Sequence, residues 1–354
     1  MKIKMTLTDS PKQKPDEADL KFGKNFTDHM FVMDYTEGRG WHDPEIKPYA
    51  PLTLDPSAMV LHYGQAVFEG LKCYRADDGR LLLFRPEMNF KRLNASDERL
   101  CIPYIDEETA LRGLNELLIT DKEWVPSAEG TTLYIRPFVI ATEPALGVHI
   151  SSKYSFIIIL NPVGAYYPEG LKPTKILIED EYVRAVKGGV GFAKASGNYA
   201  ASLKGQQKAQ RQGFTQTMWL DGVHRRFIEE VGTSNVFFKI AGEIITPALS
   251  GSILPGITRD SSIRLLKSWG LKVTECAFSV DELADAFEKG TLEESFATGT
   301  ATCVSPIGEF SWNGKKIIAG DGGIGEISKR LFDTLTGIQY GRLEDEFGWV
   351  KEVK

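Results

Sequence analysis

The sequence predicts a protein of class α+β with two domains, and three observations lead to this prediction. The chain has 354 residues, and chains of this length usually fold around more than one hydrophobic core. Short strand-like and helix-like segments are mixed along it, which favours α+β domains over a regular βαβ array. The segment YYPEGLKPT at 166–174 has Pro near both ends and Gly between them, so it separates two such halves. We predict a small N-terminal domain over residues 1–167, a linker over 168–181 and a larger C-terminal domain over 182–354.

The N-terminal half begins with twenty residues that are predicted to form a loose polar arm, followed by the aromatic segment FGKNFTDHMFVMDY. Pro86 is favourable in the first turn of a helix, and we expect it to open one over 86–100. The apolar residues of that helix lie roughly on one side, namely Met88, Phe90, Leu93 and Leu100. The other expected elements are a strand at 81–84, a helix at 107–124 and strands at 133–142 and 154–164.

The C-terminal half shows the same mixture of short elements. We expect a strand at 175–180, a helix over about 198–213, strands at 215–222 and 229–240, a helix after PGITRDS, a helix at 280–290, a strand-and-loop region at 294–308 and a last helix through the 320s and 330s. These segments do not follow a regular βαβ repeat, so we predict two separate α+β cores.

Composition narrows the classes of partner. The 42 basic and 48 acidic residues give a net charge of −6, and the basic ones are scattered, which argues against nucleic acid or an anionic membrane. The N-terminus has no apolar core of a signal peptide, and no run approaches the roughly 18 apolar residues of a membrane span. We therefore expect a cytoplasmic protein.

The cysteines and histidines indicate no metal site. The four cysteines are far apart and form no CxxC pair, so neither zinc nor a disulfide framework is indicated. The five histidines lack metal-like spacing and have no evident Ser or Cys partner. We expect no metal, and structural roles for these residues.

Lys194 lies in GFAKASGNYAASL, where nearly every neighbour is small. Most lysines are solvated surface cations, and that is the alternative interpretation here. Small neighbours would let a planar ligand approach and let the amine project into a cleft. A nucleophilic lysine forms a Schiff base with an aldehyde, and pyridoxal phosphate is the commonest such partner. That cofactor needs a carboxylate at its pyridine nitrogen and a phosphate cradle of Arg and backbone amides.

The sequence contains candidates for both requirements. Glu229 and Glu230 begin EEVGTSNVFF, and adjacent strand residues point to opposite faces, so only one of them can face a site. Two solvated carboxylates at a strand end are the alternative. LPGITRDS places Gly256 at the expected start of a helix, where free amides could hold an anion, although ordinary helix starts are commoner. The loop ATGTAT at 297–302 could also present amides or be only a turn. Arg92 could bind phosphate or pair with a surface carboxylate.

Together these segments resemble the branched-chain amino acid aminotransferases. Eight blocks follow that family's order between about residues 20 and 340, namely FGKNFTDHM, LTLDPSAMVLHYGQAVFEGLKCY, LYIRPFVIATEPALGV, NPVGAYYPEG, GFAKASGNY, EEVGTSNVFF, LPGITRDS and ATGTAT. The resemblance implies a two-domain, fold-type IV enzyme similar to D-amino acid aminotransferase. Its cofactor would be pyridoxal 5′-phosphate, its site would lie at the domain interface, and it would work as a homodimer.

The resemblance also implies roles for individual residues. Lys194 matches the lysine that binds the cofactor and moves the proton during catalysis. Glu230 matches the carboxylate at the pyridine nitrogen, and Tyr199 matches the residue that bonds to O3′ of the ring. The remaining cofactor contacts are implied for Arg92, Arg184, Thr233, Ile257, Thr258 and Thr300.

The implied substrates are Leu, Ile or Val and 2-oxoglutarate, which give 4-methyl-2-oxopentanoate or a related oxo acid and L-glutamate. The matching pocket residues are Phe22, Tyr63, Tyr134, Arg136, Tyr166, Thr300, Ala301 and, from the partner subunit, Val148. Arg136 is the natural partner for the side-chain carboxylate of glutamate, and Thr300 and Ala301 would offer amides to the α-carboxylate.

Three alternatives stay open at this point. A D-amino acid aminotransferase or an aminodeoxychorismate lyase would share the fold, but the LYIRPFV and EPALGV segments favour the branched-chain enzyme. An inactive binding protein of the same fold is a third alternative, against which Lys194 and Glu230 both argue.

Some relatives carry a CxxC redox pair after Gly-Thr-Ala, where this chain has Thr302 and Ser305 with Cys303 between them. We therefore expect no thiol switch of that kind.

Overall fold

The computed structural model describes residues 1–166 and 170–354 and divides into two compact units. Unit 1 comprises Met1–Pro168, Ala193–Ser196 and Gly337–Lys354, and unit 2 comprises Glu169–Phe192 and Gly197–Thr336. The first residues of the predicted linker lie outside the described residues. The units differ from the predicted domains in two places, because 193–196 and the C-terminal segment pack with the N-terminal residues. The predicted boundaries themselves stay a prediction.

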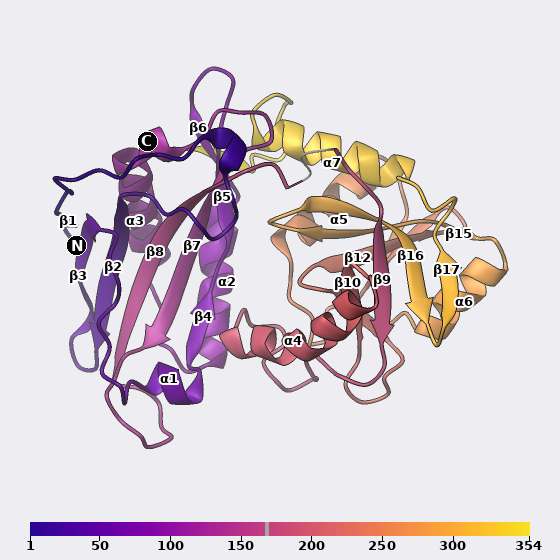
Figure 1. The fold of residues 1–354 in the computed structure, drawn as a ribbon, viewed down its shortest axis with the longest axis horizontal. Helices are drawn as coiled ribbons and strands as arrows, with labels where there is room; N and C mark the ends of the chain where they lie inside the picture. Colours follow the sequence, from indigo (N-terminus) through magenta and orange to yellow (C-terminus); the bar gives the residue numbers. More distant parts are fainter. Residues whose placement is uncertain (167–169) are drawn as a thin grey trace. The chain divides into compact units, whose positions relative to one another are not determined.

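Unit 1 is built on one sheet of nine strands among the described residues, with the order β1-β3-β2-β8-β7-β5-β6-β18 and β4 paired to β7 (Figure 1). All the pairs are antiparallel except β1 with β3. The strands are β1 (Lys4–Met5), β2 (His29–Thr36), β3 (Gly40–Pro48), β4 (Ala66–Phe68), β5 (Leu71–Arg75), β6 (Leu81–Phe84), β7 (Thr132–Ala141), β8 (Lys153–Val163) and β18 (Val350–Glu352). The strands expected at 81–84, 133–142 and 154–164 are present, within one residue at each end.

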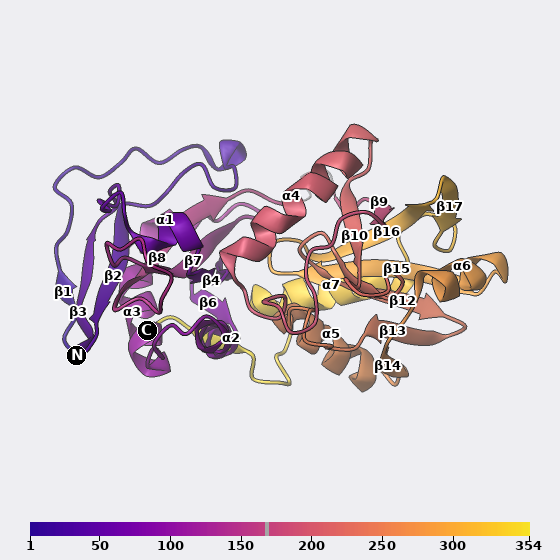
Figure 2. The ribbon, with the colours of Figure 1, turned by 90° about the horizontal axis from the view of Figure 1, so that it is seen from below.

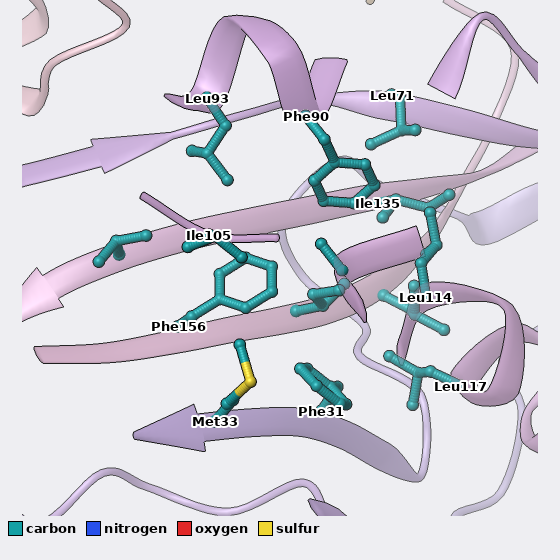
Figure 3. Packing of buried hydrophobic residues seen from close by; sticks show 14 of the residues in the cluster. Phe31, Met33, Leu71, Phe90, Leu93, Ile105, Leu114, Leu117, Ile135 and Phe156 are labelled. Carbon is teal, nitrogen blue, oxygen red and sulfur yellow. The ribbon is translucent and has the colours of Figure 1, made fainter. Parts of the chain in front are cut away.

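Helices α2 (Pro86–Arg99) and α3 (Glu107–Thr120) pack their apolar residues on this sheet, and α1 (Met59–Tyr63) is a short third helix. Figure 3 shows Phe90 and Leu93 of α2 and Leu114 and Leu117 of α3 gathered with strand side chains such as Phe156. Pro86 occupies the first helical turn of α2, as expected. Helix α2 also buries polar side chains, namely Asn89, Asn94, Ser96 and Asp97, which the amphipathic pattern did not predict.

The N-terminal arm is fastened to unit 1, so the expectation of a loose arm is wrong. Lys4–Met5 pairs in parallel with β3, and the Thr8 amide donates to Nε2 of the buried His29 at 3.0 Å. The Lys12 amide donates to Asp28 at 2.8 Å, and Glu17 accepts from backbone amides at 127 and 128. These partners are distant in sequence, so the arm's polar composition gave no sign of them.

The C-terminal segment closes the other edge of the unit 1 sheet. Strand β18 pairs antiparallel with β6, and the Arg85 amide donates to the Trp349 carbonyl at 2.8 Å. The Arg342 guanidinium bonds to Asp77 at 3.0 Å and to Glu129 at 2.8 Å. Backbone pairing and ion pairs explain why the last residues belong to unit 1.

Unit 2 contains a second sheet of nine strands among its described residues, in the order β11-β10-β9-β16-β15-β12-β13-β14 with β17 on β16 (Figure 2). Its strands are β9 (Thr174–Glu179), β10 (Gln216–Leu220), β11 (Ile228–Val231), β12 (Asn235–Ile240), β13 (Glu243–Pro247), β14 (Val273–Cys276), β15 (Leu292–Gly299), β16 (Cys303–Trp312) and β17 (Lys315–Ile318). Strand β9, the strand expected at 175–180, runs parallel to both β10 and β16 and is therefore part of the sheet.

The helices of unit 2 follow the sequence expectations closely. They are α4 (Ser196–Arg211), α5 (Ile257–Ser268), α6 (Val280–Glu288) and α7 (Glu326–Gln339). Ser279 and Glu282 form a capping box at the start of α6, and Leu283 packs into the unit 2 core. Of the helices that the structure describes, none is both long enough and apolar enough to cross a bilayer.

Candidate active site

Lys194 is held in place by its own backbone. The Phe68 amide of β4 donates to the Lys194 carbonyl at 3.0 Å, and the Lys194 amide donates to the Ser96 hydroxyl of α2 at 2.8 Å. Ala195 forms a β-bridge with Val67. The Lys194 amine lies 5.0 Å from the centroid of the Phe68 ring. The small residues around Lys194 therefore let this segment pair closely with β4 and α2, while the amine projects over an aromatic face.

Behind Phe68, Glu69 forms a buried ion pair with Arg92. Glu69 is fully buried, and it accepts from Nε of Arg92 at 2.7 Å and from Nη2 at 2.9 Å. Asn89 and the Gly70 amide also donate to Glu69, at 2.8 and 3.1 Å. Burial alone raises the pKa of the Glu69 carboxyl, but the neighbouring charges of Arg92 and Lys194 outweigh it and hold that pKa below its usual range. Arg92 is thus a buried, oriented guanidinium rather than a surface partner.

Aromatic and cationic side chains continue from Phe68 along unit 1. The Arg136 guanidinium lies 4.5 Å from the Phe68 ring centroid and donates to the Tyr134 hydroxyl at 3.0 Å. Phe22 packs edge-on against Tyr134 with ring centroids 4.9 Å apart. A Cβ on Gly70 would lie 2.1 Å from the Tyr134 hydroxyl, so only glycine fits there. The structure therefore brings together three of the predicted substrate residues, Phe22, Tyr134 and Arg136.

The other predicted substrate residues of unit 1 come from separate segments. Tyr63 ends α1, and its hydroxyl donates to the Leu146 carbonyl in the loop that carries Val148. Val148 is 84% exposed, and Tyr166 is also exposed. The structure thus connects Tyr63 with the Val148 loop, and it leaves Val148 and Tyr166 largely open to solvent.

In unit 2, the charge of the Arg184 guanidinium acts on two buried carboxylates, Glu229 and Glu230. Glu230 is 3% exposed and pairs with Arg184 at 2.9 Å. Glu229 is 5% exposed and accepts from the Ser252 hydroxyl, while its Oε2 has no hydrogen-bond partner among the described residues. Burial raises the pKa of the Glu229 carboxyl. The Ser252 hydrogen bond and the Arg184 charge lower this pKa by less, so it lies above its usual value. Two solvated carboxylates at a strand end do not fit these observations.

Glu230 is fixed by the segment that leads into α5. It accepts from the Leu254 amide at 3.1 Å and from the Asn235 side chain at 3.3 Å. A Cβ on Gly256 would lie 2.0 Å from Oδ1 of Asn235, so this glycine permits the close approach. Gly256 is the N-cap of α5 and provides no side-chain cap for the first amides of the helix. Ile257 and Thr258 therefore begin α5 close in sequence to Leu254, whose amide binds Glu230. A helix start at Gly256 was expected from the sequence.

The remaining predicted residues lie on α4 and on two turns of unit 2. Tyr199 is half-buried in the first turns of α4, three residues after the helix begins at Ser196. Thr233 is exposed in the turn between β11 and β12. Thr300 and Ala301 form the tip of the β15–β16 hairpin, where Gly299 pairs with Cys303.

This donor set fits pyridoxal phosphate. A buried carboxylate held by a guanidinium and an amide suits a protonated pyridine nitrogen. The uncapped start of α5 in unit 2 and the half-buried Arg92 guanidinium in unit 1 would each suit a phosphate, and the Lys194 amine would suit the cofactor's aldehyde. Among the described residues, no group of three or more His, Cys, Asp or Glu side chains could hold a metal ion.

Sequence reasoning missed the residues that support the site. Phe68, Glu69 and Asn89 of unit 1 and Asn235 of unit 2 were not among the predicted site residues. Glu69 carried a readable signal, because it is a charge inside the apolar run AVFEGLKCY. The other three gave none, because aromatic and amide side chains are common in such segments.

Comparisons with known proteins show the family of this chain. The class IV amino-transferase family matches residues 66–310, more than half of the chain. The chain is 59% identical over 351 residues to branched-chain-amino-acid aminotransferase 2 of Bacillus subtilis, covering 99% of this chain and 97% of that protein. It is 53% identical over 353 residues to a probable branched-chain-amino-acid aminotransferase of Staphylococcus epidermidis, covering 99% and 98% of the two chains.

Solved structures show the same fold. The branched-chain amino acid aminotransferase of Escherichia coli superposes with a TM-score of 0.77 at 27% identity, over 92% of this chain and 99% of that one. The pyridoxal-phosphate form of the Thermobaculum terrenum branched-chain amino acid aminotransferase gives a TM-score of 0.75 at 22% identity, over 92% and 98%. The expected two-domain α+β, fold-type IV architecture is confirmed. This chain therefore belongs to the branched-chain-amino-acid aminotransferases, enzymes of the pyridoxal-phosphate-dependent class IV aminotransferase family.

Proposed function

We propose that this enzyme transfers the amino group reversibly between Leu, Ile or Val and 2-oxoglutarate, giving the branched oxo acid and L-glutamate. The observation that carries the amino-acid class is the 59% identity over nearly the whole of a relative named for branched-chain amino acids. The second substrate is supported by Arg136, a guanidinium on the aromatic cluster that suits a side-chain carboxylate.

Lys194 is the proposed catalytic residue. Pyridoxal phosphate, when bound, would stabilise the carbanion that forms at the substrate's α-carbon. The Lys194 amine would hold the cofactor covalently until the substrate's amine displaces it, and the released amine would then move the proton between that α-carbon and C4′ of the cofactor. Its backbone bonds to Phe68 and Ser96 fix where the amine starts from, which supports this role.

Glu230 is the proposed anion at the pyridine nitrogen, with Arg184 holding it, and Tyr199 is the proposed partner of O3′. The other cofactor contacts are proposed from the resemblance. The phosphate would be held by Arg92 and by residues of the α5 start and the β15–β16 hairpin, with Thr233 beside the ring; those residues are Ile257, Thr258 and Thr300. The uncapped start of α5 and the burial of Arg92 support this assignment.

We propose that the pocket holds an aliphatic side chain between aromatic walls. Phe22 and Tyr134 are in contact, which supports a shared wall, and Tyr63 and Tyr166 are assigned by resemblance. Thr300 and Ala301 would bind the α-carboxylate through their amides. Val148 would act from the partner subunit of a homodimer, and its 84% exposure supports a role outside its own protomer. We place the enzyme in the cytoplasm, without nucleic-acid or membrane partners.

The test is the visible absorption spectrum of the purified protein before and after adding L-leucine and, separately, D-alanine. We expect L-leucine alone to bleach the cofactor band, 2-oxoglutarate to restore it, and Lys194→Ala to show neither response. Bleaching by D-alanine instead would overturn the substrate assignment and point to a D-amino acid aminotransferase. Oxaloacetate in place of 2-oxoglutarate as the better acceptor would overturn the second substrate only.

A further inference from the structure

We propose that Glu69 is a positioning residue that orients the Arg92 guanidinium for the cofactor's phosphate. The proposal rests on the function proposed above for Arg92. No role for Glu69 follows from the sequence motifs or from the family resemblance.

The geometry of Glu69 fixes Arg92 on one side. Both carboxylate oxygens are used, with Nε of Arg92 at 2.7 Å from Oε1 and Nη2 at 2.9 Å from Oε2. This bidentate arrangement sets the plane of the guanidinium as well as its position. A single hydrogen bond or a lysine at position 92 would leave that plane free.

Glu69 is itself immobilised by neighbours that donate hydrogen bonds. Asn89, one helical turn before Arg92 on α2, donates to Oε2 at 2.8 Å, and the Gly70 amide donates at 3.1 Å. Asn89 also donates to the Gly70 carbonyl at 3.2 Å. The carboxylate is 0% exposed, so water does not compete for these bonds. Glu69 is therefore a buried carboxylate held in one orientation by specific donors, and it differs in this from a solvated surface carboxylate.

Glu69→Gln tests the proposal, because glutamine keeps the side-chain shape but removes the charge and one acceptor. Asp97→Asn is the matched control. Asp97 is a fully buried carboxylate on the same α2 helix, and neither of its oxygens has a hydrogen-bond partner in the described part of the chain. The measurement is the dissociation constant of pyridoxal phosphate for the refilled apoenzyme of each variant, without any amino acid.

We expect Glu69→Gln to weaken pyridoxal phosphate binding by at least about tenfold, as loss of an outer partner of a bound group does. Asp97→Asn should stay within about twofold of the parent. In an Arg92→Gln background, Glu69→Gln should add little further loss, because its effect passes through Arg92. A merely structural defect would instead weaken binding equally in both backgrounds. An unchanged dissociation constant in Glu69→Gln, or an equal loss in both backgrounds, would overturn the positioning role.

If Glu69→Gln fails to fold by circular dichroism, Glu69→Asp decides, because it keeps the charge and withdraws it from Arg92. We then expect weaker cofactor binding, and unchanged binding would overturn the proposal. Since no amino acid is present, an error in the proposed substrates leaves these results unaffected. An Arg92→Gln protein that bound pyridoxal phosphate as tightly as the parent would instead remove the function on which the proposal rests.

Discussion

The two units hold opposite arrangements of buried charge. In unit 1, one fully buried carboxylate, Glu69, is paired with Arg92, and the charge of Lys194 also lowers its pKa. In unit 2, one guanidinium, Arg184, is paired with Glu230, and its charge also lowers the pKa of Glu229. Among these groups, unit 1 therefore has a surplus of positive charge and unit 2 a surplus of negative charge.

Each arrangement by itself suits a different group of pyridoxal phosphate. Pyridoxal phosphate has an anionic phosphate and a ring nitrogen that is useful when protonated. A site with surplus positive charge suits the first, and a site with surplus negative charge suits the second. Buried ion pairs are weak evidence for stability, so a functional reason for these two arrangements is the better explanation.

The largest expected effect comes from removing the guanidinium of unit 2. Arg184→Gln leaves Glu229 and Glu230 buried without their cation, which should destabilise the protein by about 3–5 kcal/mol. Thermal and urea unfolding of the apoenzyme measure this effect. Binding of pyridoxal phosphate should also weaken, because Glu230 loses its anchor.

Arg226 provides the matched control for Arg184. It pairs with Asp281 at 2.6 Å in the same unit, but the two side chains are 60% and 49% exposed. Arg226→Gln should change the free energy of unfolding by less than about 1 kcal/mol. Equal losses in the two variants would break the comparison, because burial would then have no influence on the Arg184 cluster.

A smaller, substrate-specific effect is expected in unit 1. Arg136→Gln removes a cation that rests on Phe68 and Tyr134, and only 2-oxoglutarate and glutamate offer it a second carboxylate. We expect the KM for 2-oxoglutarate to rise by about 10- to 100-fold, as for loss of one charge-assisted pair. The KM for leucine should change by less than about threefold.

Tyr134→Phe is the control for Arg136, since it keeps the ring and removes only the hydroxyl that accepts from Arg136. It should have a small effect on both substrates. Steady-state kinetics with each substrate varied in turn measure the split. A parallel rise in both KM values for Arg136→Gln would assign Arg136 to the general shape of the pocket instead.

The sequence predicted the elements whose signal is local. Strands β7 and β8 are long apolar runs, and α2 starts at Pro86, so all three elements were predicted within a residue or two. Strands β2 and β3 were not predicted, because β2 has a continuous apolar run in place of alternation and β3 contains charged residues and two prolines. Strand β9 was placed in a linker because YYPEGLKPT contains two prolines just before it.

The predicted site depended on family resemblance, and its supports depended on distant contacts. Lys194 and Ser96 are 98 residues apart, and Glu69 and Arg92 are 23 residues apart. No local pattern reports such a pair. Burial is the other missing quantity: EEV at 229–231 reads equally well as a solvated strand end, and only the sheet shows that both carboxylates are inside. The residues' roles in the reaction stay predictions.

The smallest expected effect distinguishes the two carboxylates of unit 2. Burial raises the pKa of Glu229, so its folded-state stability contribution is greatest at low pH and is lost as the pH rises through that raised pKa. Glu229→Gln keeps an acceptor for the Ser252 hydroxyl and removes the buried charge. The variant should therefore be more stable than the parent at pH 7–8, by about 1 kcal/mol or roughly 2 °C in Tm, with the gain shrinking toward pH 4. Its turnover should stay within about threefold of the parent, whereas Glu230→Gln, which lacks the proposed anion at the pyridine nitrogen, should lose most activity. A Glu229→Gln protein that lost activity as Glu230→Gln does would show that the surplus charge is shared by both carboxylates, and the assignment of a single functional anion to unit 2 would be wrong.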